Sequence, residues 1–321
     1  MLPRLLLLGV VAAIAIAGWI STWVLWRYQD ATREIGRLEA RGFEAPTLIV
    51  LGSGGAYENP ARRGPALALG AGGDVVLLDA GRGVAEALRR ARIPVEQPEA
   101  VLLTSLVPEN TVGLDDLAAA RFRSGQARPL RVVGPPGTLA LARALAEAHS
   151  VASAALAASI GLPAEGAGLA AEETAQEWMG RSGGLDLRAV PLAGGPFPAL
   201  AWRVDAQGRA LAVTSAPFAS ERTAALASGA DALVAGAVFA DAVRAAVEAG
   251  AADPGRLQRE AALQLSLADA AALAARAGAG RLVLVRLQPP PLFHLQFERA
   301  AGRDFAGPVV VAEDGDEIEL R

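Results

Sequence analysis

The pattern of apolar and polar positions divides the chain into an apolar start, a charged segment and a long mixed region. Residues 5–26 contain no charged side chain, and this stretch is long enough for a helix that crosses a bilayer. Trp19, Trp23 and Trp26 cluster at one end of it, as tryptophans do at a membrane interface. We therefore expect residues 1–26 to form a transmembrane anchor.

A cleaved signal peptide is the alternative, because residues 15–17 (Ala-Ile-Ala) resemble a small-residue cleavage site. Cleavage there would leave a tryptophan-rich end on the mature chain, which favours the anchor. Residues 27–46 are charged and predict a juxtamembrane helical linker. Arginines lie on both sides of the apolar segment, so the positive-inside rule leaves its orientation open. Since short signal-anchor N-termini usually stay inside, we expect a single pass through a bacterial inner membrane, with the soluble domain on the periplasmic side.

From residue 47 onward, short apolar runs that end in glycine or polar residues alternate with amphipathic stretches. This pattern predicts helices at 83–93, 113–125, 139–161, 221–229 and 266–278. It predicts strands at 47–55, 100–104, 130–138, 185–192, 199–205, 209–215, 232–239, 281–288 and 309–320, with two more around a glycine-rich turn within 65–81. Hairpins and βα units are mixed, so we expect an α/β sandwich, a mixed sheet system with helices packed outside, in one large domain or two small ones.

Composition narrows the chemistry that this domain can perform. The chain has 321 residues, a net charge of −4 and no lysine, and its pattern predicts no basic face for a nucleic acid. It has no cysteine, which excludes thiolate nucleophiles and cysteine-ligated zinc. Its two histidines, His149 and His294, are too few for any site that needs three imidazoles, and we expect both to be structural.

Several motifs, taken in order, resemble those of a known fold family. They are LGSGGAYENPARRGPAL (51–67), VVLLDAGRG (75–83), LRVVGPPGT (130–138), the strand–helix–strand segment 208–239 and the helix–strand segment 267–289. Together they resemble the ribonuclease Z-like branch of the metallo-β-lactamase fold. The resemblance implies an αββα sandwich over nearly the whole of 47–321, and it implies a metal-dependent hydrolase as the ancestral activity.

The same resemblance implies where the family's two metal ions should be bound. Family members carry T-H-x-H-x-D-H where this chain has LLTSLVPENTVGLDDL (102–117), and here only Thr104 of that motif remains. The positions at which the resemblance implies metal ligands are occupied by Ser105, Val107, Glu109, Asn110, Ala193, Ala216 and Arg286. Ala235 and Gly236 stand for a further His-Glu pair, and Gln264 lies near a histidine that assists catalysis in the family.

These residue types do not suit a two-metal hydrolase, which generates hydroxide on ions held by imidazoles and carboxylates. Val107 and Ala193 have no lone pair to donate, and the permanent charge of Arg286 repels a cation. We therefore expect no metal and no cofactor, and we expect a membrane-anchored pseudoenzyme with a binding, scaffolding or regulatory role. Its partner is then a second copy, an active relative, or a small anionic ligand at Arg286. The alternatives for Arg286 are pairing with Glu109 or Asp79, or simple exposure to solvent.

A hydrolase of the phosphodiesterase type with a rebuilt site is the second hypothesis. Asp79, Glu109 and Asp116, with Asp115 beside them, follow strands of the same sheet, and carboxylates hold Mg²⁺ or Ca²⁺. Against this, paired acids at a helix start are typical of a complement to the helix dipole. Cleavage of tRNA is not expected, because the Ala-rich insertion 139–181 has no basic residue between Arg143 and Arg181 to meet phosphates.

Overall fold

The computed structural model describes residues 2–35, 38–56, 59, 61–215, 219–291 and 293–321, which divide into two units, Met1–Glu39 and Ala40–Arg321. The first unit contains one long helix, α1, which spans Leu2–Ile35. Gly9–Gln29 is the one stretch of the described helices that is long and apolar enough to cross a membrane. A signal sequence has the same character, so both interpretations remain. The predicted boundary at residue 26 lies inside this continuous helix.

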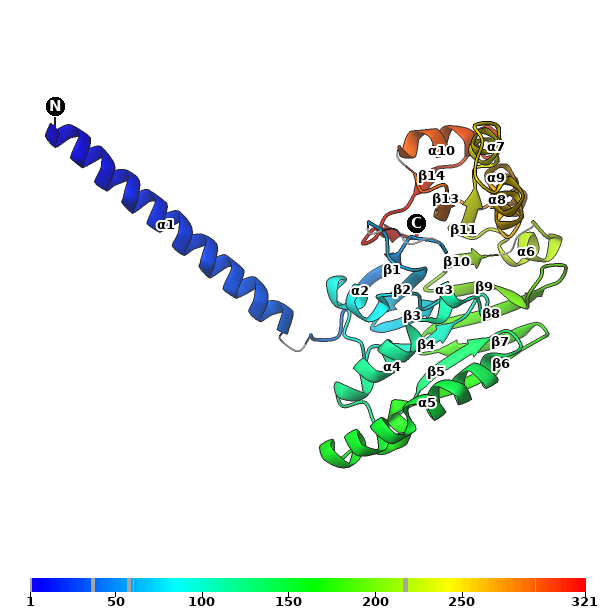
Figure 1. Ribbon diagram of the computed structural model, residues 1–321. Coiled ribbons are helices and arrows are strands. Elements are labelled where there is room, and N and C mark those ends of the chain that lie inside the picture. The colour runs from blue at the N-terminus through cyan, green and yellow to red at the C-terminus, as the bar shows by residue number, and fades with distance from the viewer. Residues whose placement is uncertain (1, 36–37, 57–58, 60, 216–218, 292) are drawn as a thin grey trace. The chain divides into compact units, whose positions relative to one another are not determined.

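The second unit is built from two mixed sheets (Figure 1). The first has the order β15 (Glu317–Glu319), β1 (Phe43–Gly52), β2 (Ala66–Gly72), β3 (Asp74–Leu78), β4 (Pro98–Leu102), β5 (Leu130–Gly134), β6 (Leu169–Glu173). The second has the order β14 (Val309–Val311), β13 (Leu282–Gln288), β11 (Ala232–Val238), β10 (Arg209–Thr214), β9 (Ala199–Ala206), β8 (Leu185–Leu192), β7 (Trp178–Ser182), and β12 (Leu265–Ser266) pairs with β11. The predicted α/β sandwich is confirmed.

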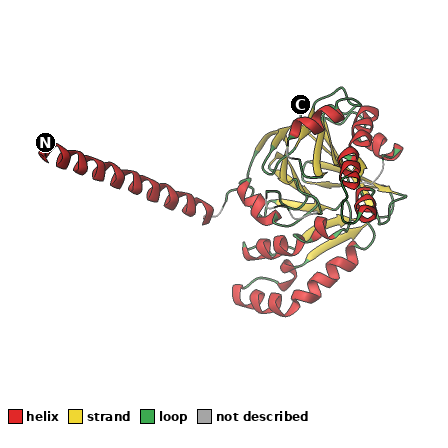
Figure 2. Ribbon diagram, turned by 45° about the horizontal axis from the view of Figure 1, so that its top comes forward, coloured by secondary structure: helices red, strands yellow, loops and turns green. Residues whose placement is uncertain are grey.

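Helices cover the outer face of each sheet (Figure 2). The first sheet carries α2 (Val84–Arg90), α4 (Leu114–Arg123), α5 (Thr138–Ile160) and the 3₁₀ turn η1 (Ala164–Ala167), and the short α3 (Pro108–Thr111) lies at the strand ends. The second carries α6 (Glu221–Leu226), α9 (Leu267–Ala277) and α10 (His294–Ala301), while α7 (Ala240–Glu248) packs against α8 (Pro254–Ala261). The order of layers is therefore αββα.

The strands read as continuous apolar runs because both of their faces are buried. Successive side chains of a strand point to opposite faces, so in β1 Leu48 and Val50 enter the core between the sheets. Ile49 and Leu51 enter the core beneath α2 and α4. Trp202 of β9 is fully buried between the sheets, and its indole N–H donates to a main-chain carbonyl at 2.9 Å. Its N–H is therefore satisfied even though the ring is fully buried.

Polar residues appear where the apolar runs of these strands end. The pairs β3–β4, β10–β11 and β11–β13 are parallel, so their carboxyl ends share one edge of the sandwich. The two sheets meet there, since the amide of Leu200 donates to the carbonyl of Thr104 at 2.8 Å. The amide of Arg286 likewise donates to the carbonyl of Ser53 at 2.8 Å. This edge gathers side chains that are distant in the sequence.

Candidate functional site

A buried polar cluster lies at the carboxyl ends of β3, β4 and β10. The amide and hydroxyl of Thr104 donate to the two carboxylate oxygens of Asp79 at 2.8 and 2.7 Å. The Nδ2 group of Asn110 donates to the hydroxyl oxygens of Thr104 and Ser105, both at 3.0 Å. Ser215 donates its hydroxyl to Thr104 at 2.8 Å. Thr104 is therefore the centre of a network that joins three strand ends and the α3 turn.

Asp79 is the acid at the base of this cluster. It is the first residue after β3 and has a left-handed backbone (φ 60°), a conformation that aspartate tolerates better than most residues. Burial raises the pKa of Asp79 from 3.8 to about 6, while the charge of Arg286 and the hydrogen bonds from Thr104 act in the opposite direction. Desolvation outweighs these contacts because the carboxylate has exchanged bulk water for only a few donors.

Arg286 of β13 lies above the same strand ends. It is 8% exposed, and its backbone is also left-handed (φ 52°). Its Nη2 atom lies 3.5 Å from an oxygen of Glu109, whereas its Nε and Nη1 atoms have no hydrogen-bond partner among the described residues. Gly236 lies beside the side chain, and a Cβ there would be in van der Waals contact, at 3.4 Å, with the Cβ of Arg286. Within the described part of the chain, the arginine is thus buried with one long contact to an acid.

A cavity of about 430 Å³ opens over Arg286 and the loop after β4. Its polar lining consists of Ser105, Glu109, Ser215, Arg256, Glu260, Gln264, Arg286 and Gln288, and its apolar lining consists of Ala56, Val107, Pro108, Phe197 and Leu263. The side-chain oxygen of Gln264 is buried and lacks a partner within the described part of the chain. A void of about 20 Å³ beside Asp79, Thr104 and Arg286 lies at the same strand ends. The larger cavity, of about 430 Å³, has the volume of a small-molecule site.

Most of the residues that the sequence singled out meet at this cavity. Ser105, Val107, Glu109, Gln264 and Arg286 line it, Asn110 is buried beside it, and Asp79 lines the smaller void.

Two singled-out positions do not meet there, and a third is not described. Ala193 is exposed in the turn between β8 and β9 and is not among the lining residues. Ala216 lies outside the described residues. Asp116 is exposed on α4 and lines neither of the two cavities at the strand ends, so it does not join Asp79 and Glu109.

Sequence reasoning missed several lining residues. Ser215 follows β10 much as Thr104 follows β4, and this position at a strand end was an available signal. Phe197 comes from a proline- and glycine-rich turn. Arg256 and Glu260 come from α8, a helix with no buried residue, and no apolar pattern marked them.

Comparison with known proteins identifies the family. No family model matches the chain. Over 281 residues it is 31% identical to ribonuclease Z of Mycolicibacterium paratuberculosis, which covers 85% of this chain and 98% of that protein. The chain belongs to the ribonuclease Z family. Another ribonuclease Z, from Mycobacterium marinum, is 27% identical over 285 residues and covers 85% of the chain and 98% of that protein. The predicted resemblance is therefore confirmed.

Solved structures confirm the fold of this ribonuclease Z family member. The metallo-β-lactamase fold protein YhfI from Bacillus subtilis superposes with a TM-score of 0.66 at 18% identity, over 86% of this chain and all of that one. The short form of human tRNase Z superposes with a TM-score of 0.64 at 18% identity, over 86% and 99% of the two chains. The chain therefore has the metallo-β-lactamase fold of a hydrolase-type family.

The donor atoms at the cavity do not fit the divalent ions that this fold family implies. Among the described residues there is no group of three or more His, Cys, Asp or Glu that could hold a metal. Both carboxylate oxygens of Asp79 already accept hydrogen bonds from Thr104, and Glu109 faces the charge of Arg286. A hydrolytic metal pair needs several imidazoles and carboxylates directed at common points. The side chains at this cavity offer two arginines, two glutamates and otherwise neutral groups instead.

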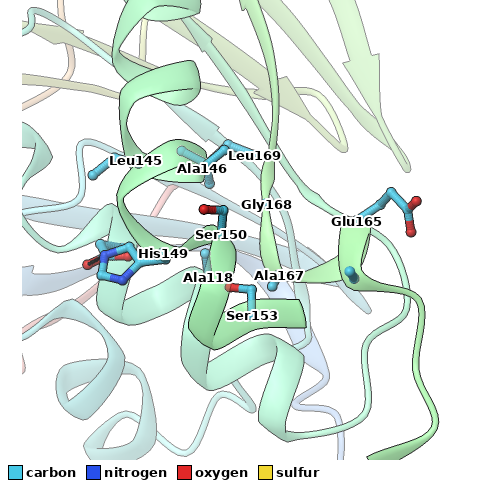
Figure 3. Close-up of a pocket in the computed structure, with 12 residues that line it drawn as sticks. Ala118, Leu145, Ala146, His149, Ser150, Ser153, Glu165, Ala167, Gly168 and Leu169 are labelled. Atoms are coloured by element: carbon cyan, nitrogen blue, oxygen red, sulfur yellow. Dashed lines mark ion pairs between the residues drawn. The ribbon is translucent and has the colours of Figure 1, made fainter. Parts of the chain in front are cut away.

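Both histidines lie away from this cavity. His149 on α5 forms an ion pair with Asp115 of α4, with Nε2 and Oδ2 2.8 Å apart. Figure 3 shows this histidine beside a second cavity of about 250 Å³, which α4, α5 and η1 line largely with alanine and leucine. His294 begins α10 and lies 3.0 Å from Glu313. Asp115 therefore links two helices of the first sheet's outer layer.

Proposed function

We propose that this ribonuclease Z family member is a catalytically inactive, membrane-anchored pseudoenzyme with a binding role. The observation that carries the proposal is the buried guanidinium of Arg286 at the cavity over the strand ends. By the resemblance to the family, Arg286 stands where the last metal-binding histidine would be. A permanent cation at that position opposes a divalent ion and attracts an anion instead.

The other positions around Arg286 support the same conclusion. Ser105, Val107 and Asn110 stand at three further ligand positions of the family motif, and none of them carries an imidazole or a carboxylate. The polar ones are engaged with one another, because Asn110 donates to Ser105 and to Thr104. The loop is therefore stabilised by internal hydrogen bonds, where a metalloenzyme would direct the same positions at ions.

The proposed location follows from α1. Gly9–Gln29 would cross a bacterial inner membrane once and hold the domain on the periplasmic side. The proposed partners are the membrane, a second copy or an active relative, and a small anionic ligand. A nucleic acid is not among them, because residues 144–180 carry no basic side chain. Carbonate extraction of membranes and mass measurement of the mature N-terminus test the anchor; release into the wash, or a shortened chain, would contradict it.

A hydrolysis assay tests the catalytic part of the proposal. Full-length chain purified in detergent is incubated with bis(p-nitrophenyl) phosphate in the presence of added Zn²⁺ or Mn²⁺. We expect no turnover above the buffer rate. Turnover that the substitutions Glu109→Gln or Asp116→Asn abolish would overturn the proposal and support the rebuilt carboxylate site. Glu86→Gln on the exposed face of α2 is the matched control for loss of a carboxylate.

A further inference from the structure

The guanidinium of Arg286 is buried but incompletely paired. Charge-assisted hydrogen bonds between guanidinium and carboxylate are about 2.7–2.9 Å long. The contact between Arg286 and Glu109 is 3.5 Å, and two further nitrogen atoms of the guanidinium are buried without a partner among the described residues. A buried charged donor left unsatisfied destabilises the fold, so such groups are rare unless they serve a site.

The unpartnered guanidinium lies in a cavity that can hold a ligand. Arg286 lines the cavity of about 430 Å³, together with the hydroxyl group of Ser105, which accepts from Asn110 and can donate its own proton to an anion. Arg256 adds a second cation at the rim, with its Nε atom 2.8 Å from Glu260. These groups are the hydrogen-bond donors that oxyanions require.

Part of the remaining wall of the cavity is apolar and suits an apolar part of a ligand. Val107, Phe197 and Leu263 form this part, beside the polar side chains of Gln264 and Gln288. The ligand that these walls favour combines an oxyanion group with a compact apolar body. Glu109 is the competitor that such a ligand has to displace from Arg286.

We propose that the cavity binds a small organic anion, whose phosphoryl or carboxylate group is held by Arg286 while its apolar body packs against Phe197 and Leu263. This inference rests on the proposed function, because a metal-loaded site would leave no room for an anion at the guanidinium. Glu109 then holds Arg286 in the free protein and releases it when the ligand binds.

Calorimetric titration of the full-length chain in detergent tests this site. Phenyl phosphate and benzoate share a ring and differ in the oxyanion, and inorganic phosphate lacks the ring. We expect saturable binding of at least one of the two aromatic anions, more tightly than of inorganic phosphate. Substitution of Phe197→Ala is expected to reduce that preference, whereas no binding of either aromatic anion would overturn the proposal.

Two variants that act in opposite directions keep the test independent of folding. Arg286→Gln is expected to weaken binding about tenfold or more, since it removes a charge-assisted contact. Glu109→Gln removes the competitor and is expected to tighten binding several-fold. The control Arg90→Gln removes a surface arginine on α2 and is expected to leave binding unchanged. Unaltered affinity in Arg286→Gln, or weaker binding in Glu109→Gln, would overturn the proposal.

The same titration separates this inference from the proposed function. Release of phenol from phenyl phosphate would overturn the pseudoenzyme assignment, whatever the role of Arg286. A chain that neither hydrolyses nor binds these anions would overturn the ligand class alone.

Discussion

Two poorly exposed arginines of the second sheet have contrasting surroundings. The side chains of Arg203 on β9 and Arg286 on β13 are 15% and 9% exposed. Arg203 donates from Nε to both oxygens of Asp205 at 2.9 and 3.0 Å, and from Nη1 to the carbonyls of Leu226 and Ser228 at 3.0 and 2.9 Å. Arg286 has one acidic contact at 3.5 Å and a left-handed backbone.

The hydrogen bonds of Arg203 stabilise the fold, whereas Arg286 is buried with few such bonds. Arg203 links β9 to the end of α6. Its guanidinium donates to the carboxylate of Asp205 and to two main-chain carbonyls. Among the described residues Arg286 makes no comparable set of bonds, and in the proposed function it stands at the position of a lost metal ligand. Substitution of Arg203 should therefore lower the free energy of unfolding, whereas substitution of Arg286 should change it little and affect ligand binding instead.

The largest expected effect is at Asp79, a buried acid whose pKa the charge of Arg286 lowers. Its folded-state pKa is about 6, above its ordinary value of 3.8, so the native state binds this proton more tightly than the unfolded chain. Its contribution to stability is therefore full below about pH 4 and is lost as pH rises through about 6, by up to about 3 kcal/mol. Urea unfolding of wild type and Asp79→Asn between pH 4.5 and 7.5 measures this. The free energy of unfolding of the variant, relative to that of wild type, should rise with pH. A constant difference across that range would contradict the account.

Arg203→Ala tests the structural side of the comparison. We expect it to lower the free energy of unfolding by about 2 kcal/mol, because it leaves the carbonyls of Leu226 and Ser228 and the carboxylate of Asp205 without their donor. Urea unfolding followed by the fluorescence of the buried Trp202 measures the loss. Arg188→Ala is the control, since its exposed side chain reaches Asp205 only at 3.5 Å, and an equal loss in that variant would remove the distinction.

Arg286→Gln should change the free energy of unfolding by less than about 1 kcal/mol in the absence of ligand, since little of its hydrogen-bonding capacity is used. Arg286→Gly should be at least as stable as Arg286→Gln, because glycine adopts φ 52° without strain. The same unfolding experiment measures both variants. A loss as large as that of Arg203→Ala would show that Arg286 is structural, against our interpretation.

The smallest expected effect is at the second cavity. His149→Ala removes an ion pair whose two side chains are 50% and 43% exposed, and exposed pairs contribute about 0–1 kcal/mol. We expect a loss below about 0.5 kcal/mol, and no change in the binding of phenyl phosphate or benzoate. Differential scanning calorimetry and the titration described above measure the two; altered anion binding would link the two cavities and weaken the comparison.

Much of the fold followed from the sequence because buried strands are visible in it. The apolar run predicted at 185–192 coincides with β8, and the predicted helix at 139–161 is shifted by one residue from α5. Several unpredicted elements are exposed ones: β6 is largely solvent-facing, and α7 and α8 bury no residue, although the unpredicted α10 does bury Phe297 and Ala301. Elements that contribute little to a core leave little apolar pattern, which is why the exposed ones were missed.

The candidate site was predictable only in part. Asp79 directly follows β3, and Thr104 comes shortly after β4. These strands are parallel, and parallel strands bring their carboxyl ends to one edge of a sheet. The rotation of α4 about its axis determines where its two acids point. Asp115 reaches His149 of α5, while its neighbour Asp116 is exposed. Adjacent helical positions point about 100° apart, and the sequence alone does not say which one faces a neighbour.

The metal content of the purified full-length chain tests the central claim most directly. Chain produced in medium supplied with Zn²⁺ and Mn²⁺ is freed of loosely bound ions on a desalting column, and its metal is counted by plasma mass spectrometry. The donor set around Arg286 predicts far less than one metal ion per chain, in wild type and in Glu109→Gln alike. If wild type holds one or two ions per chain and Glu109→Gln loses them, the account is contradicted and a metal-dependent hydrolase is supported.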